Sequence, residues 1–126
     1  MRQSTVSSIK RSQKESLYLR TISKLFNQAA QDDAKLRGLF VSRVSLSDDK
    51  SHVTVFFHSL EGREHFEKNF DALVIYKPSL RKALAHEIPS RYTPDVVFRY
   101  DEIFDKIQRV EELIEQANPK DETEDI

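Results

Sequence analysis

The amino-acid sequence predicts one α+β domain in which a three-stranded sheet carries helices on one face. Its 126 residues are enough for a single domain. Apolar residues recur at helical spacing in some stretches and alternate with a period of two in others. The order of these stretches is helix, strand, strand, helix, helix, strand, helix. So few helices cannot cover both faces of the sheet, and one face is therefore expected to be open to solvent.

The N-terminal part combines a basic segment with a long amphipathic helix. Residues 1–11 are rich in Ser, Thr and Arg without periodicity, and they predict a flexible basic arm. An organelle transit peptide is a less favoured interpretation of so short a segment. Residues 12–31 have a helical pattern with the apolar stripe Tyr18, Leu19, Ile22, Leu25, Phe26 and Ala29. The folded domain is expected to span residues 12–117.

Two adjacent strands with a polar turn at residues 47–50 predict a hairpin. The first strand spans residues 39–47. Alternation places Phe40, Val44 and Leu46 on one face of this strand, and it places Val41, Arg43 and Ser45 on the other. The second strand spans residues 51–60, with Val53, Val55 and Phe57 on the core face. A third strand, residues 95–100, follows a helical crossover and is expected to be parallel to the second. The open face would carry Arg43, Thr54 and Arg99.

The segments around the third strand are helical. Because proline disrupts a helix interior, residues 62–88 form either two helices that meet at Lys77–Pro78 or one helix kinked there. Asp101 can cap a last helix. The stripe of this last helix is the most regular in the chain: Ile103, Ile107, Val110, Ile114 and Ala117. Residues 118–126 predict a disordered acidic tail.

The composition excludes several kinds of site. Without cysteine there is no disulfide, thiolate metal site or cysteine nucleophile. The two glycines are too far apart for a P-loop or a dinucleotide fingerprint. The four histidines lack metal-ligand spacing and are expected to be surface or edge-strand residues. We therefore predict no catalytic residue, no metal and no cofactor. The polar start and the lack of long apolar runs predict no secretory signal and no membrane span.

Charge is distributed unevenly along the chain, although the net charge is only −1. Residues 1–30 contain six basic residues and one acidic residue. Such a basic end indicates a polyanionic partner, and the alternative is an ordinary solvated surface. If a helix starts at Pro78, its free N–H groups and the nearby Lys77, Arg81 and Lys82 suit a phosphate. The alternative there is a proline kink with solvated cations.

Four segments together resemble the bacterial ribosome-binding factor A family. SRVSLSDD (42–49) and SHVTVFF (51–57) are similar to the family's strand T-R-V-x-L-S, its Asp-containing turn and S-H-A-x-V-Y. TPDVVFRYDE (93–102) resembles its V-P-E-L-x-F-x-Y-D-E junction, and RVEELI (109–114) resembles R-I-x-x-L-L. The resemblance runs from about residue 12 to residue 117.

This resemblance implies a type II KH-like domain of order α-β-β-α-(kink)-α-β-α, in which a helix–kink–helix replaces the glycine-rich loop of other KH modules. The family's kink reads Ala-x-Gly. The aligned residues here are Tyr76-Lys77-Pro78, and proline is expected to kink the helix by a different device. The implied function is a non-catalytic factor that binds the immature 30S subunit and its 16S rRNA. It would assist late maturation, including rRNA 5′-end processing and adaptation to cold.

Charge and resemblance together predict an RNA-binding surface made of Lys10, Arg11, Lys14, Arg43, Lys77, Pro78, Arg81, Lys82 and Arg91. Ribosomal proteins or assembly GTPases are further expected partners. The protein is expected to be a cytoplasmic monomer, in a bacterium or in an organelle. The alternative function is a protein-interaction module that docks through the C-terminal helix and the acidic tail without binding RNA.

Overall fold

The computed structural model describes residues 2–117 and confirms the predicted order of elements. That order is α1 (Arg2–Asp32), β1 (Leu39–Leu46), β2 (His52–Ser59), α2 (Arg63–Lys68), α3 (Phe70–Glu87), β3 (Asp95–Tyr100) and α4 (Glu102–Ala117). It agrees with the order that the resemblance implies. The predicted acidic tail, residues 118–126, lies outside the described residues. No helix in the described part of the chain is long and apolar enough to cross a membrane.

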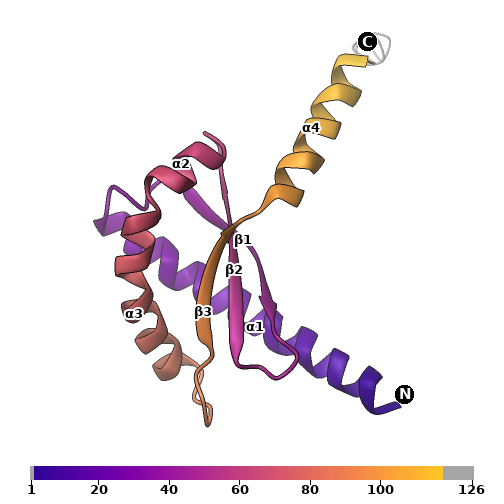
Figure 1. Ribbon diagram of the computed structural model, residues 1–126, viewed down its shortest axis with the longest axis vertical. Helices are drawn as coiled ribbons and strands as arrows, with labels where there is room; N and C mark the ends of the chain where they lie inside the picture. Colours follow the sequence, from indigo (N-terminus) through magenta and orange to yellow (C-terminus); the bar gives the residue numbers. More distant parts are fainter. Residues whose placement is uncertain (1, 118–126) are drawn as a thin grey trace, which may run out of the picture.

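The sheet has the strand order β1-β2-β3, with β1 antiparallel and β3 parallel to the central strand. The crossover from β2 to β3 runs through α2 and α3, as expected for parallel neighbours. Helices α1 and α3 lie together on one face of the sheet (Figure 1). The opposite face is open, which confirms the predicted one-sided architecture.

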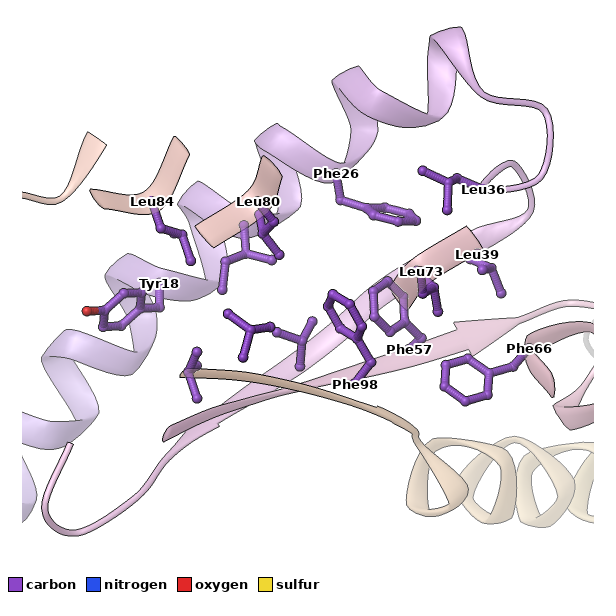
Figure 2. Close-up of a cluster of buried hydrophobic side chains, with 14 of the residues drawn as sticks. Tyr18, Phe26, Leu36, Leu39, Phe57, Phe66, Leu73, Leu80, Leu84 and Phe98 are labelled. Atoms are coloured by element: carbon purple, nitrogen blue, oxygen red, sulfur yellow. The ribbon is translucent and has the colours of Figure 1, made fainter. Parts of the chain in front are cut away.

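The core lies between this covered face and the two long helices (Figure 2). Phe57 of β2 is fully buried at its centre, with the Phe26 and Phe98 rings 5.0 and 5.4 Å away between centroids. Both pairs have the edge-on geometry that aromatic rings favour. The predicted stripe of α1 supplies Tyr18, Ile22 and Phe26, each exposed by 1% or less. The helical periodicity therefore identified the covered face correctly.

The predicted alternation of β1 is wrong in its first half because the strand contains a β-bulge. The pairing with β2 shifts between Val41 and Arg43, so Ser42 is the extra residue. The shift reverses which residues face the core. Leu39 is buried and Val41 packs against the core, whereas Phe40 is 46% exposed. A period-two pattern cannot include an inserted residue, so the sequence did not reveal it.

Of the two alternatives predicted at Lys77–Pro78, the one with two separate helices meeting there is wrong. Pro78 lies inside α3, and the break falls at Asn69. The backbone N–H and the side-chain amide of Asn69 both donate to the carbonyl of His65, at 3.2 and 3.0 Å. The Asn69 carbonyl accepts the first hydrogen bonds of α3, from Ala72 and Leu73. Asn69 therefore ends one helix and starts the next, which proline could not do without an N–H group.

The two terminal helices differ from expectation in extent and in packing. Helix α1 begins at Arg2, so residues 2–11 are helical where the sequence predicts a flexible arm. This segment contains no Pro or Gly that would stop the helix. Helix α4 extends away from the sheet (Figure 1), and none of its residues is buried. Its regular stripe is therefore exposed, unlike the stripe of α1.

Candidate nucleic-acid interface

The connection between α3 and β3, residues 88–94, forms the centre of a basic surface. Neighbouring segments of the same chain hold it through hydrogen bonds at several points. Arg81 Nη2 of α3 donates to the Thr93 carbonyl at 3.2 Å, and the Asp95 N–H donates to the Ser51 carbonyl at 2.8 Å. Within the loop, Ser90 Oγ donates to the Tyr92 carbonyl at 2.8 Å. Pro94 is buried. The loop therefore has a defined position against α3 and the β1–β2 turn.

A pocket of about 520 Å³ lies between this loop and α3. Four of the predicted site residues line it: Pro78, Arg81, Lys82 and Arg91. The loop completes the wall with Tyr92 and Thr93. Among the described residues, Arg81, Lys82 and Arg91 have no carboxylate partner within salt-bridge distance. Their charge is therefore available to an anionic ligand.

A second pocket of about 300 Å³ lies on the other side of the same loop and shares Arg91 and Tyr92 with the first. Lys14 of α1 and Lys50 of the β1–β2 turn line it. Asp49 also reaches this pocket, and hydrogen bonds from Ser51 and Ser47 hold its pKa at about 2. Asp49 is therefore ionised at neutral pH and offsets part of the positive charge of this pocket, whereas no acidic residue lines the pocket on the α3 side of the loop.

Two of the predicted cations are already paired with acids. Arg43 Nε lies 3.1 Å from the Asp101 carboxylate, and the Arg43 guanidinium lies 3.7 Å above the centre of the Phe56 ring. Arg11 forms an ion pair with Asp48 of the β1–β2 turn. A cation that is compensated by a neighbouring acid attracts phosphate less strongly than a free one. The structure thus separates Arg11 and Arg43 from the cluster around the loop.

The remaining two predicted residues lie apart from both pockets. Lys10 is exposed on α1, one turn before Lys14. Lys77 is half-buried on α3, with its Nζ 5.7 Å from the centre of the Phe98 ring. Because α3 continues through Pro78, no helix begins beside Lys77, and the expected phosphate site at a helix N-terminus is absent from the described chain. Side chains alone supply the positive charge there.

Sequence reasoning missed two residues of this surface as site residues. Tyr92 is 77% exposed and lies at the junction of the two pockets, and Lys50 comes from a turn and stands 42 residues before Tyr92 in the sequence. The sequence signal for Tyr92 was its place between Arg91 and Thr93, in a loop bounded by Pro89 and Pro94. No comparable signal marks Lys50, because the fold alone brings the turn beside the loop.

In the described part of the chain, no three His, Asp or Glu residues are placed to hold a metal ion. The expectation of surface or edge-strand histidines is wrong for His58, which is 8% exposed on the central strand. Its ring lies 4.2 Å from that of Phe104 between centroids, so the first turn of α4 covers it.

Comparison with known proteins identifies a family. The family model described as ribosome-binding factor A matches residues 10–114. A ribosome-binding factor A from Xylella fastidiosa (strain M23) is 30% identical over 120 residues, which are 93% of each chain. Another from Rhodopseudomonas palustris (strain BisB18) is 34% identical over 95 residues, covering 74% of this chain and 69% of the relative.

Solved structures agree with this result. The crystal structure of ribosome-binding factor A from Thermus thermophilus superposes with a TM-score of 0.61 at 26% identity. The match covers 71% of this chain and 94% of that one. A Thermus thermophilus ribosome-binding factor A homology model, fitted into the cryo-EM map of its complex with the 30S subunit, gives a TM-score of 0.56 at 27% identity. That match covers 68% of this chain and 89% of the other.

Proposed function

This chain belongs to the ribosome-binding factor A family, and we propose that it binds the immature 30S subunit through 16S rRNA without catalysing a reaction. The basic surface around residues 88–94 is the proposed contact. We further propose that binding assists late maturation, including processing of the rRNA 5′ end and growth in the cold. The protein would act as a monomer in the cytoplasm.

The observation that carries this proposal is the convergence of uncompensated cations from three separate segments. Lys14 comes from α1, Arg81 and Lys82 from α3, and Arg91 from the loop. The overall charge of −1 gives no general attraction to RNA, so a local cluster is needed. Cations that neutralise phosphates gain free energy from the release of counterions, which makes such binding dependent on salt.

The test is a double charge reversal in this cluster. Arg81→Glu with Lys82→Glu should weaken binding to purified immature 30S subunits by at least about tenfold at moderate salt, because it removes two phosphate contacts and adds repulsion. Co-sedimentation through a sucrose gradient measures the bound fraction. The matched control is Lys106→Glu with Arg109→Glu on α4, which changes the net charge equally outside the cluster. Equal binding by both variants would refute the assignment of the surface.

The maturation role has its own test in cells. Removing the protein should cause precursor 16S rRNA with an unprocessed 5′ end to accumulate and should slow growth more in the cold than at the optimal temperature. Primer extension measures the 5′ end. Restoring the wild-type chain should reverse both effects, and restoring the Arg81→Glu, Lys82→Glu variant should not. Normal 5′ ends in the depleted strain would argue against a role in maturation.

A second candidate function is docking to a protein through α4. Its stripe contains Ile103, Ile107, Val110 and Ile114, each between 54% and 57% exposed. An unpartnered apolar face of this kind is typical of a helix that packs into a groove. If docking is the main function, Ile107→Ser with Val110→Ser should abolish binding of the protein to the 30S subunit. The affinity of the wild-type protein for the subunit should then depend little on salt. If RNA binding is the main function, the Arg81→Glu, Lys82→Glu variant should weaken binding to the 30S subunit more than the Ile107→Ser, Val110→Ser variant does.

A further inference from the structure

Tyr92 differs from the other three tyrosines of the chain in its exposure. Tyr18 and Tyr100 are 1% and 8% exposed, and Tyr76 is partly buried against the core. Tyr92 is 77% exposed. Its ring contributes little to the hydrophobic core, so the fold does not explain an aromatic residue at this position.

The ring is presented by a loop with a defined conformation. The carbonyl of Tyr92 accepts a hydrogen bond from Ser90 Oγ, and the carbonyl of Thr93 accepts one from Arg81. The fixed φ angles of Pro89 and Pro94 restrict the chain on either side. A loop backbone held in this way loses little conformational entropy when the ring that it carries binds a ligand.

Cations lie in the pockets on both sides of the ring. Arg81 and Lys82 lie in the pocket on one side, and Lys14 and Lys50 lie in the pocket on the other. The Arg91 guanidinium is 5.6 Å from the ring centre. An aromatic face flanked by cations is how proteins hold single-stranded nucleic acid, with bases on the ring and phosphates on the cations.

From this geometry we infer that Tyr92 stacks one unpaired nucleobase of the bound RNA, while the flanking phosphates contact the cations of the two pockets. The inference rests on the proposed RNA-binding function and adds the class of ligand, a single-stranded segment. A base inside a duplex is stacked on its neighbours and exposes no face to the ring. The same cations would still attract a duplex. The Tyr92 ring is therefore the group that distinguishes single-stranded from double-stranded RNA.

The test compares Tyr92→Leu with Tyr92→Phe, which keep the net charge unchanged. The probes are fluorescein-labelled decauridylate and an RNA duplex of ten base pairs, and binding is measured by fluorescence anisotropy at low salt. Tyr92→Leu should weaken binding to decauridylate by about 5- to 150-fold, as for loss of one stacked base. Tyr92→Phe should retain binding within about twofold, and duplex binding should change in neither variant.

Several results would overturn the inference. One is that both variants lose decauridylate binding equally, and another is that Tyr92→Leu loses none. A third is that Tyr92→Leu weakens duplex binding as much as decauridylate binding. The last is that the wild-type chain does not bind decauridylate. Because Tyr92 is exposed, the fold should survive both changes, and circular dichroism checks this. The proposed function fails separately, since it requires the Arg81→Glu, Lys82→Glu variant to lose 30S binding whatever the result at Tyr92.

Discussion

At the scale of single residues, Asp101 connects three elements. Its carboxylate accepts hydrogen bonds from Ser42 Oγ at 2.6 Å, from Arg43 Nε at 3.1 Å and from the backbone N–H of Phe104 at 3.0 Å. It thereby caps α4 and fixes the bulge of β1. Burial of Asp101, which is 2% exposed, raises its pKa, but these hydrogen bonds and the Arg43 charge outweigh burial and hold the pKa below 3.8.

Asp101→Asn should therefore lower the free energy of unfolding by about 1–3 kcal/mol at neutral pH. Asparagine caps a helix as well as aspartate does, so the loss reports mainly the contacts with Arg43 and Ser42. A pKa lowered in the folded state stabilises the fold above the unfolded pKa and loses that effect as the pH falls through the folded pKa. Urea titrations measure the free energy of unfolding. The difference in this free energy between wild type and variant should be constant above about pH 5 and should shrink below pH 3.8.

The control for this prediction is Asp48→Asn, which removes the partner of Arg11. The side chain of Asp48 is 95% exposed, so this substitution should change the free energy of unfolding by no more than about 0.5 kcal/mol. An equal effect of both substitutions, or a constant difference down to pH 2, would contradict the role assigned to Asp101.

At the scale of elements, the sequence predicted the type and order of every helix and strand, because hydrophobic periodicity records which face is buried. Irregularities within elements were harder to predict. The bulge at Ser42 is held by the single Ser42 hydroxyl proton, which is shared between the Phe56 carbonyl and the carboxylate of Asp101, 59 residues away in the sequence. A meeting of two helices at Pro78 was one of two alternatives expected from local chemistry, yet the break lies at Asn69, whose hydrogen bonds end α2 and begin α3.

Pro78→Ala tests the continuity of α3. Proline inside a helix lacks the N–H that would donate to Val74 and costs up to about 3 kcal/mol, partly offset by a less flexible unfolded chain. The substitution should therefore stabilise the protein by about 1–2 kcal/mol in urea unfolding. It should change RNA affinity less than twofold, because Pro78 contributes only apolar wall to its pocket.

The neighbouring substitution Ser79→Ala is the control for helix propensity and should change stability by about 0.5 kcal/mol or less. A destabilised Pro78→Ala variant that also loses RNA binding would indicate instead that proline sets a functional bend at this position.

At the scale of the whole molecule, the candidate interface could be predicted only in part from the sequence. The sequence identified basic residues one by one, but it could not say which of them carry uncompensated charge. Arg11 and Lys14 are three residues apart on α1, yet Arg11 meets Asp48 while Lys14 lines the pocket beside Tyr92. The difference depends on where the β1–β2 turn packs, which is a property of the complete fold.

This difference predicts the salt dependence of RNA binding. If Lys14, Lys50, Arg81, Lys82 and Arg91 each neutralise a phosphate of a single strand, the logarithm of the association constant should fall with the logarithm of salt concentration with a slope of about −3.5. Lys14→Gln should reduce this slope by about 0.7, because one counterion fewer is released. Arg11→Gln should leave the slope unchanged, because Asp48 already compensates that charge. Anisotropy titrations of decauridylate between about 50 and 200 mM salt measure all three slopes. A larger change for Arg11→Gln than for Lys14→Gln would place the bound strand along α1 and its turn rather than across the loop.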